Sequence, residues 1–365
     1  MTLDPQTVHV DLGSRSYDIQ IGSGNLCNWE FLLTRCPQAT HAVIITDTNV
    51  DPLFGDKLAD YLEDEDFEID LMIVDAGEPS KSPEVAHELW ERMLEEGTDR
   101  QSIVVALGGG VVGDLAGFVA ATYSRGLRLL QVPTTLLAQV DSSVGGKVGI
   151  NLPQAKNMVG AFWQPLGVVI DVDTLNTLPD REYRAGLAEV IKYGVILDHE
   201  FFTFLEQHIQ AVQERDAGTL QTIIHRCCRL KADVVENDER EESGHRVVLN
   251  YGHTFCHAME AASGYQELLH GEGVAIGMLC ASRLAECLGR TDSITTQRQF
   301  DLLTALQLPT QVPAFDPEEL LRLMYHDKKT NSGRLRFVLP SRIGHVELVD
   351  DVRDEQVLSA LVNPT

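Results

Sequence analysis

Short apolar runs alternate with amphipathic stretches through the first half of the chain. The runs at 41–47, 69–75 and 101–107 are rich in valine and isoleucine, as are strands buried on both faces of a parallel sheet. Between them, at 52–63 and 83–96, apolar positions recur with helical spacing. Strands that alternate with helices in this way form βαβ units. We therefore predict a Rossmann-like α/β domain built on a parallel sheet.

Further strands are predicted on either side of this region. Residues 7–21 alternate in places, which predicts an opening hairpin that turns at Gly13 and Ser14. Apolar runs at 127–133 and 167–173 predict two more strands. The α/β domain is therefore expected to extend to residue 178.

From Pro179 onward the apolar spacing is almost entirely helical. Helices are predicted at 181–196, 200–213, 217–235, 247–262, 273–288, 294–305 and 317–327. A late segment, 334–350, could form a short hairpin or an irregular clamp. The length of 365 residues exceeds what one hydrophobic core usually serves. We expect two domains, an α/β domain over 1–178 and an all-α domain over 179–365.

The balance of charge limits the partners of the chain. Hydrophobic residues make up 44% and charged residues 23%, which are ordinary values for a globular protein. Lysine and arginine number 29 against 55 aspartates and glutamates, so the formal net charge is −26. Such a charge argues against a nucleic acid or an anionic membrane as partner. An anionic substrate would need a local cluster of lysine and arginine.

Cysteine usage and apolar segments indicate a reducing compartment. The seven cysteines include no CxxC pair, which does not favour a disulfide framework. The first residues, MTLDPQTVHVDLG, lack the basic start and apolar core of a signal peptide. The longest apolar region, 103–123, is interrupted by Asp114 and several glycines, so it does not predict a membrane span. We expect a cytoplasmic protein.

A glycine-rich turn follows the strand at 101–107. Gly108, Gly110 and Gly113 match GxGxxG, which places backbone amides and a helix N-terminus where a pyrophosphate can bind. An acidic residue about 20 positions later usually holds the ribose, but the region around Arg128 is basic. Asp47, with Asn49 nearby, could supply that acid from an earlier strand end. A tight strand-to-helix turn with no ligand remains the alternative.

A second glycine segment does not form a phosphate loop of the kinase type. It carries Lys147, but Asp141 stands where that loop needs glycine, and Val148 replaces the serine or threonine that would hold magnesium. A Walker ATPase is therefore excluded. Lys147 on its glycine segment, with Thr134 and Thr135 nearby, is suited to contact an anion or a cofactor.

Three histidines cluster in the sequence after residue 246. His253 and His257 are four apart on a predicted helix and share a face, and His270 follows 13 residues later. Two of these imidazoles with an acid would form a catalytic zinc site. Glu189, on an otherwise hydrophobic predicted helix, is the best candidate for the acid. The alternative is that they are ordinary structural histidines.

Basic side chains stand in apolar or glycine-rich surroundings, where an anionic substrate would need them. Lys192 lies three residues after Glu189 on the same predicted face. Arg246, Asn250 and His253 lie with His257 on one stripe of the helix predicted at 247–262 and its first flanking residue. The alternative for each is a solvated helix face. The complete set is Arg125, Lys147, Lys156, Lys192, Lys231, Arg246, Lys328 and Lys329.

Several long motifs resemble one known family. They are GGGVVGDLAGFVAATYSRG, QVPTTLLAQVDSSVGGKVGIN, AKNMVGAFWQP, TLPDREYRAGLAEVIKYG, NYGHTFCHAME and HGEGVAIGM. Over nearly its whole length the chain resembles the 3-dehydroquinate synthases, which are sugar-phosphate cyclases of the shikimate pathway. The sequence departs at Tyr251, where an aliphatic residue is common, and in one extra residue between Lys231 and Arg246.

The resemblance implies an NAD-binding α/β domain, a helical domain that binds zinc or cobalt, and a homodimer. The metal ligands would be Glu189, His253 and His270, and His257 becomes a substrate contact and proton-transfer group. Cofactor positions are Asp47, Asn49, Glu78, Lys81, Gly110, Val111, Val112, Gly113, Asp114, Thr134, Thr135, Lys147, Lys156, Thr174, Leu175, Asn176 and Thr177. Substrate positions are Asp141, Lys147, Lys156, Asn157, Lys192, Lys231, Arg246, Asn250 and His257, with Arg125 from the neighbouring subunit and either Lys328 or Lys329.

The reaction that the resemblance implies converts 3-deoxy-D-arabino-heptulosonate 7-phosphate to 3-dehydroquinate and phosphate. It combines transient oxidation by NAD, β-elimination of phosphate, re-reduction, ring opening and an intramolecular aldol closure. A cyclase of a sugar phosphate without a carboxylate is one alternative. A metal-dependent polyol dehydrogenase, which would release NADH, is another. A binding module without activity is disfavoured because all three metal positions are filled.

Overall fold

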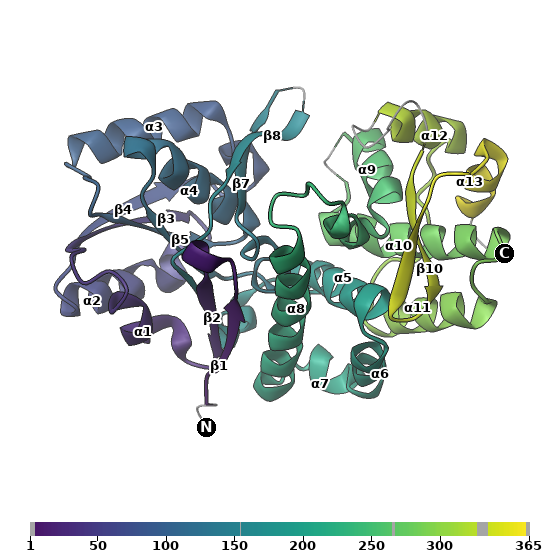
Figure 1. The fold of residues 1–365 in the computed structure, drawn as a ribbon, viewed down its shortest axis with the longest axis horizontal. Coiled ribbons are helices and arrows are strands. Elements are labelled where there is room, and N and C mark those ends of the chain that lie inside the picture. The colour runs from purple at the N-terminus through teal and green to yellow at the C-terminus, as the bar shows by residue number, and fades with distance from the viewer. Residues whose placement is uncertain (1–3, 154, 265–266, 327–334, 363–365) are drawn as a thin grey trace. The chain divides into compact units, whose positions relative to one another are not determined.

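The computed structural model describes residues 4–153, 155–264, 267–326 and 335–362 (Figure 1). The chain divides into two compact units. The first unit contains Met1–Leu178 and Leu220–Arg240, and the second contains Pro179–Thr219 and Glu241–Thr365. The sequence predicts a domain boundary after residue 178, and in the structure residues 220–240 of the second half group with the first unit.

The first unit is built on a seven-stranded sheet with the order β1-β2-β9-β6-β5-β3-β4. Only β1 and β2 pair antiparallel, and the other neighbours run parallel. The predicted α/β fold class is thereby confirmed. The strands are β1 (Gln6–Val10), β2 (Tyr17–Gly22), β3 (His41–Asp47), β4 (Glu68–Val74), β5 (Ile103–Gly108), β6 (Arg128–Pro133) and β9 (Gly167–Asp171).

Both faces of this sheet are buried, which explains its continuous apolar strands. Val43 and Val104 lie in the core on the side of the helices α3 and α4. Ile44 and Val105, the next residues along the same strands, lie in the opposite core with Leu58 of α2. Successive side chains of a strand point to opposite faces, so both sets must be apolar. The helices are α1 (Glu30–Leu33), α2 (Asp56–Asp64), α3 (Pro83–Glu95) and α4 (Gly110–Thr122).

An antiparallel hairpin of two strands was not predicted from the sequence. It consists of β7 (Lys147–Leu152) and β8 (Ala155–Phe162). Gly149 and Gly160 are partners in it. A Cβ atom on Gly160 would lie 2.3 Å from the carbonyl oxygen of Val148, so the strands approach too closely there for any side chain. Glycines are required at this close approach, and they interrupt the alternation of apolar and polar side chains from which a strand would be predicted.

The helix α8 (Ala217–Asn237) belongs to the first unit from Leu220 onward, although it follows the predicted boundary. Its side chains donate to the backbone of the opening hairpin. Gln221 donates to the carbonyl oxygen of Ile21 at 3.0 Å, and Arg229 donates to that of His9 at 2.5 Å. These bonds satisfy polar groups near the edge of the sheet, and no sequence periodicity predicts them.

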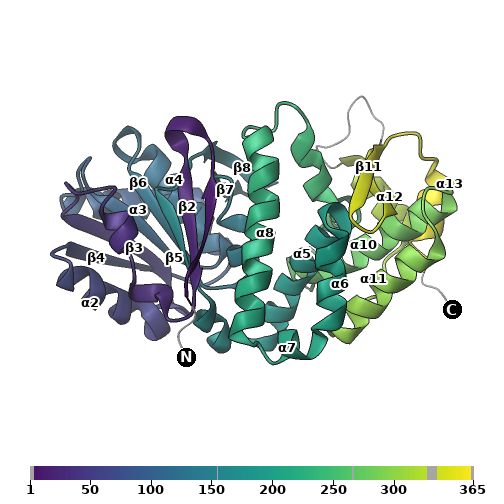
Figure 2. The ribbon, with the colours of Figure 1, turned by 60° about the horizontal axis from the view of Figure 1, so that its bottom comes forward.

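The second unit is helical, as predicted, and is centred on α10, which packs against α5, α9, α11, α13 and the strand β10 (Figure 2). The predicted hairpin at 334–350 is present as β10 (Phe337–Arg342) and β11 (His345–Val349). The helices are α5 (Asp180–Leu197), α6 (His199–Gln207), α7 (Ile209–Gln213), α9 (His253–Ala262), α10 (His270–Cys287), α11 (Ser293–Ala305), α12 (Pro317–His326) and α13 (Asp354–Ala360). The sequence did not predict α13, and the helix predicted at 200–213 is divided into α6 and α7 at His208.

The helix predicted at 247–262 is wrong in its first part. Residues His245–Asn250 form a 3₁₀ helix, and α9 begins only at His253. Gly252 between them has a φ of 79°, in the left-handed region that interrupts a right-handed helix. Arg246 and Asn250 therefore do not share a helical stripe with His253 and His257.

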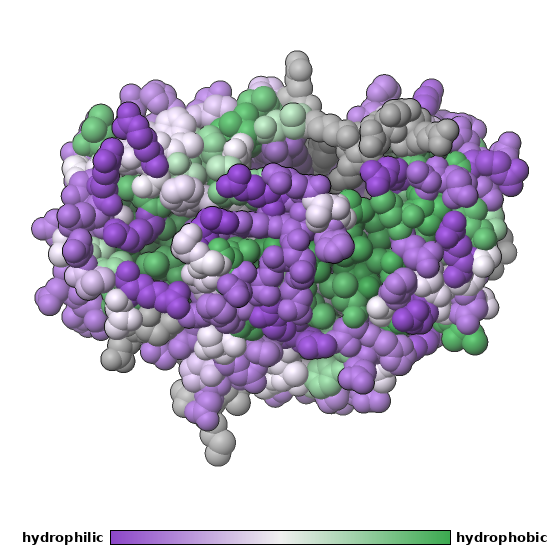
Figure 3. Space-filling model, viewed as in Figure 1, coloured by the Kyte–Doolittle hydropathy of each residue, from purple (hydrophilic) through white to green (hydrophobic). Residues whose placement is uncertain are grey.

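Polar side chains cover most of the face in Figure 3, with smaller apolar areas between them. None of the helices in the described parts of the chain has both the length and the apolar character needed to cross a membrane.

Candidate active site

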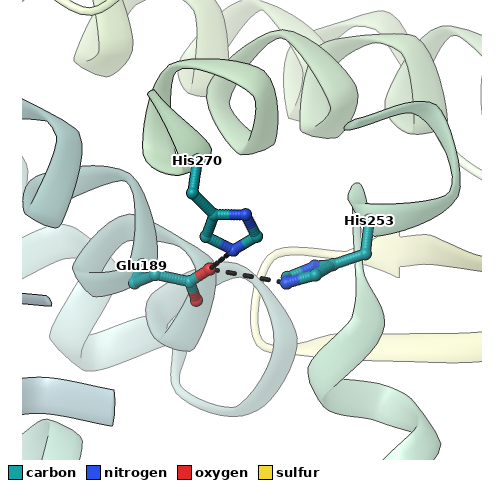
Figure 4. A group of neighbouring side chains, drawn as sticks. All are labelled: Glu189, His253 and His270. Atoms are coloured by element: carbon teal, nitrogen blue, oxygen red, sulfur yellow. Dashed lines mark ion pairs between the residues drawn. The ribbon is translucent and has the colours of Figure 1, made fainter. Parts of the chain in front are cut away.

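Three side chains of the helical unit point toward one another (Figure 4). Glu189 comes from α5, and His253 and His270 are the first residues of α9 and α10. The Nε2 atom of each histidine lies 3.6 Å from Oε1 of Glu189, which is too far for a hydrogen bond. Two atoms that bind one zinc ion at about 2.1 Å in a tetrahedron are about 3.4 Å apart. The spacing of these ligand atoms therefore fits a metal ion.

Glu189 keeps its negative charge although its side chain is fully buried. Lys192, one turn later on the same face of α5, forms an ion pair with it. Burial would raise the pKa of the Glu189 carboxyl, but the Lys192 ammonium and the His270 imidazole hold this pKa at about 2. The group is therefore an ionised carboxylate, which is the form that binds a cation.

Each imidazole is oriented by a partner on its other nitrogen. Nδ1 of His253 lies 3.1 Å from the carbonyl oxygen of Tyr251, and Nδ1 of His270 lies 3.1 Å from Oε1 of Glu260. Both partners are acceptors, so Nδ1 donates to them, and Nε2 faces Glu189, where it can bind a metal ion once it has lost its own proton. This is the usual outer arrangement around a metal-bound histidine. Glu260 was not predicted from the sequence, although it is an acid on a largely buried helix.

A second group of possible ligands shares His270. Cys256, Glu260 and His270 also bring one ligand atom each within 4.8 Å of the others. In this group Nδ1 of His270 already donates to Glu260, and burial raises the pKa of the Cys256 thiol. Since a thiol binds metal as the thiolate, the group with Glu189 is the better metal site.

Close contacts of glycines position the metal-binding helices. A Cβ atom on Gly271 would lie 1.8 Å from the carbonyl oxygen of Ala185 in α5. A Cβ atom on Gly277 would lie 2.2 Å from the carbonyl oxygen of Gly252, just before α9. α10 can therefore approach both neighbours at backbone distance. This approach brings the starts of α9 and α10 to Glu189.

The spacing of the histidines left open which two would face Glu189. The structure brings His253 and His270 to it, and His257 is not part of either ligand group among the described residues. The ring of His257 instead lies edge-on to that of His253, with centroids 5.6 Å apart. Arg246 is buried in the same unit, with Nε 3.5 Å from Oε1 of Glu241.

In the first unit, predicted cofactor positions lie at the carboxyl ends of the parallel strands. Asp47 ends β3, and its Oδ1 accepts from the backbone amide of Asn49 at 2.8 Å. Thr134 follows β6, and its buried hydroxyl has no hydrogen-bond partner within the described chain. Open α/β sheets bind ligands at this edge.

The glycine turn after β5 brings the N-terminus of α4 to the same edge. A Cβ atom on Gly109 would lie 3.0 Å from the side chain of Thr135, and one on Gly113 would lie 2.9 Å from that of Gln131. The first amides of α4 have no acceptor within the helix, and no acidic residue stands in its first turn. Gly110, Val111 and Val112 therefore offer donors to an anion.

Lysine side chains of the first unit are paired with acids. Nζ of Lys81 lies 2.5 Å from Oδ2 of Asp114. Burial raises the pKa of Asp114, and Lys81 opposes that effect. Lys231 is buried, forms an ion pair with Asp141 and donates to its carbonyl oxygen at 2.8 Å.

The remaining predicted residues differ in exposure. Thr174 and Leu175 are buried in a 3₁₀ helix, whereas Asn176 and Thr177 are exposed. The exposed side chains also include Arg125, Lys147, Lys156 and Asn157. Arg125 and Asn157 have φ values of 68° and 54°, in the left-handed region. Lys328 and Lys329 lie outside the described residues.

A parallel-sheet unit followed by a helical unit that carries a Glu-His-His site defines a class of two-part, metal-dependent enzymes. Solved structures of this class are similar to the chain. A 2-epi-5-epi-valiolone synthase from Streptomyces hygroscopicus subsp. jinggangensis, with NAD⁺ and Zn²⁺ bound, is 31% identical, with a TM-score of 0.86 and coverage of 94% of this chain and 95% of that one. A 2-deoxy-scyllo-inosose synthase complexed with carbaglucose-6-phosphate, NAD⁺ and Co²⁺ is 27% identical, with a TM-score of 0.89 and coverage of 98% and 99%.

Sequence relatives identify the family within this class. The family models "3-dehydroquinate synthase N-terminal" and "3-dehydroquinate synthase C-terminal" match residues 71–185 and 186–330. A 3-dehydroquinate synthase of Desulforamulus reducens is 50% identical, over 97% of this chain and 99% of that protein. One from Rhodopirellula baltica is also 50% identical, over 99% and 98%. The chain belongs to the 3-dehydroquinate synthase family, which confirms the resemblance.

Proposed function

We propose that this chain converts 3-deoxy-D-arabino-heptulosonate 7-phosphate to 3-dehydroquinate and phosphate, with NAD⁺ as a recycled cofactor and a divalent metal ion. One observation carries the proposal. A buried, ionised Glu189 faces the Nε2 atoms of His253 and His270, in a chain about half identical over its whole length to 3-dehydroquinate synthases.

Glu189, His253 and His270 would hold zinc or cobalt, because their atoms have the spacing of ligands around one ion. When bound, the metal lowers the pKa of a substrate hydroxyl and stabilises negative charge on its oxygen. The carboxylate of Glu189 is already in the form that binds the metal, and each imidazole binds it through an unprotonated Nε2. Little rearrangement of the chain is needed before the substrate arrives.

NAD⁺ would bind at the carboxyl edge of the sheet in the first unit. Asp47 and Asn49 would hold its ribose, and the first amides of α4 would hold its pyrophosphate. Glu78, Lys81, Thr134 and Thr135 complete the cofactor contacts, with Asp114 paired to Lys81. The cofactor supplies a hydride acceptor and returns the same hydride, so it is not consumed.

The substrate is a phosphorylated sugar acid, and basic side chains of this acidic chain would bind its two charged ends. Lys147, Asn157 and Arg125 would hold the phosphate. Lys192, Arg246 and Asn250 would hold the carboxylate and ring hydroxyls. His257, next to His253 but outside the metal group, would move a proton to or from the substrate. The contacts proposed for the carboxylate favour this substrate over a sugar phosphate that has no carboxylate.

A polyol dehydrogenase is the second candidate, since a glycerol dehydrogenase from Schizosaccharomyces pombe shares the fold at 17% identity and a TM-score of 0.63. The two functions differ in the fate of NAD⁺. The metal-loaded protein, given the heptulosonate phosphate and a trace of NAD⁺, should release phosphate over many turnovers without net NADH. Stoichiometric NADH, or phosphate release limited to the amount of NAD⁺, contradicts the proposal.

We also propose a cytoplasmic homodimer in which Arg125 reaches the phosphate of the neighbouring subunit. Arg125→Ala and His270→Ala homodimers should each be inactive. When the two are mixed and exchange subunits, activity should return, because one site of the mixed dimer receives an intact Arg125 from its partner. Activity that stays absent in a mixture shown to have exchanged subunits contradicts action across the dimer.

A further inference from the structure

Asn151, near the end of β7, makes three hydrogen bonds to two other segments of the first unit. Its side-chain nitrogen donates to Oε1 of Glu78 at 2.7 Å. Its side-chain oxygen accepts from the backbone amide of Asn157 at 2.8 Å. Its own backbone amide donates to the carbonyl oxygen of Lys81 at 2.8 Å. One residue thus joins the loop after β4 to both sides of the hairpin.

These partners are the residues assigned above to two different ligands. Glu78 and Lys81 belong to the cofactor contacts, and Asn157 belongs to the phosphate contacts. Asn157 also has a φ of 54°, a conformation that a residue with a side chain adopts at some cost. The bond from its amide to Asn151 helps to offset that cost and fixes where the Asn157 side chain begins.

We propose that Asn151 is a positioning residue that sets Glu78 for the cofactor and Asn157 for the substrate phosphate. The inference rests on the proposed function, because that function assigns the roles of Glu78 and Asn157. Asn151 acts through the two ends of one amide group. Its NH₂ end orients the carboxylate of Glu78, and its oxygen holds the turn that carries Asn157.

The two ends of the amide can be tested separately. Asn151→Asp keeps an oxygen for the Asn157 amide but replaces the donor to Glu78 with a second carboxylate. Asn151→Ala removes both bonds. A role in hairpin stability alone would change both ligands together, in proportion to the loss of stability.

The experiment measures NAD⁺ affinity by calorimetry and the KM for the phosphorylated substrate, using the metal-loaded full chain. Asn151→Asp should weaken NAD⁺ binding about tenfold, as expected for a lost bond to a charged group, and change the substrate KM by less than about twofold. Asn151→Ala should weaken both. Asn25→Asp serves as the control, because Asn25 is buried in the same unit and its side-chain nitrogen donates to the backbone of Gln20 and Ile170. It should lower the melting temperature without separating the two ligands.

A double substitution tests the contact between Asn151 and Glu78 directly. Glu78→Gln alone should weaken NAD⁺ binding. In that background the glutamine amide can donate to an aspartate at position 151, so adding Asn151→Asp should weaken NAD⁺ binding little further. If Asn151→Asp weakened NAD⁺ binding by the same factor in the wild-type and the Glu78→Gln backgrounds, the proposed contact would be overturned.

Two further results would overturn the inference. One is wild-type NAD⁺ affinity in Asn151→Asp, and the other is an equal loss of both ligands in that variant. If the wild-type chain itself binds no NAD⁺ or releases no phosphate, the proposed function fails instead, and the two failures are therefore distinguishable.

Discussion

Glu189 is the residue on which the metal site depends most strongly. It is fully buried, and its charge is balanced by Lys192 and by the facing imidazoles. Glu189→Gln should weaken zinc binding by more than the roughly 10–100-fold caused by losing an outer partner of a ligand. It should also destabilise the apo fold by about 3–5 kcal/mol, because Lys192 becomes a buried charge without its carboxylate. Competition with a chelator and thermal unfolding measure the two effects.

The double variant Glu189→Gln/Lys192→Met separates these effects. Removing the second charge should return most of the stability, since a buried pair replaced by uncharged groups is often neutral. The double variant should bind zinc as weakly as Glu189→Gln does. Zinc affinity near that of the wild type in either variant would show that Glu189 is not a ligand.

Glu260 should act on the metal through His270. Its carboxylate accepts from Nδ1 of His270 and thereby fixes the ring. We expect Glu260→Ala to lower zinc affinity about 10–100-fold, with a smaller loss in Glu260→Gln, whose amide oxygen still accepts the bond. Glu88→Ala, at an exposed position on α3, is the matched control and should bind zinc as the wild type does. Equal zinc affinity in all four proteins would contradict this role.

At the scale of elements, the close packing of α10 on α5 controls the position of His270. Gly271→Ala would place a methyl group 1.8 Å from a backbone oxygen, so α10 must move away from α5. We expect a loss of roughly 1–3 kcal/mol in stability, as for other overpacked sites, together with weaker zinc binding.

Gly218→Ala in α8 provides the control for this substitution. Its Cβ atom would meet Asp216 at an ordinary 3.6 Å. Alanine is the better helix former, so this variant should be at least as stable as the wild type, with unchanged zinc affinity. Zinc affinity that is unchanged in Gly271→Ala as well would show that the contact does not position His270.

The elements also show which parts of the fold the sequence could predict. The strand at 41–47 begins and ends at the predicted residues, because a run that is apolar on both faces is a local signal. The helix predicted at 247–262 was wrong because its apolar spacing continues through Gly252 while the backbone turns there. A Cβ atom on Gly252 would lie 2.8 Å from the backbone nitrogen of Met278, so the turn is imposed by the approach of α10.

In the candidate site, too, the sequence could predict local geometry but not the approach of distant segments. Glu189 and Lys192 are three residues apart on one helix, so local geometry alone predicted that they share a face, on which the structure shows them as an ion pair. Spacing also put His253 beside His257, but the choice of His270 depends on where the start of α10 lies. The resemblance to the family supplied that choice. The bond from Asn151 to Glu78 connects residues 73 positions apart in sequence, so no local pattern could have predicted it.

At the scale of the whole molecule, a chain with a net charge of −26 must bind an anionic substrate. The distant acids repel this substrate, and the lysines and arginines that we propose to bind it would attract it. Salt screens these opposing effects over different distances. The Debye length is about 30 Å at 0.01 M ionic strength, about 8 Å at 0.15 M and about 3 Å at 1 M.

We therefore expect kcat/KM for the heptulosonate phosphate to pass through a maximum as salt increases. From about 0.01 to 0.15 M, salt should screen the distant acids and leave the short-range attraction largely intact, so the rate constant should rise. Toward 1 M the local attraction is screened as well, and the rate constant should fall. Sodium chloride and potassium chloride should give the same curve at equal ionic strength, whereas sulfate would also compete for the phosphate contacts and acetate for the carboxylate contacts. A steady fall from the lowest salt would mean that the local cluster outweighs the net charge at every distance.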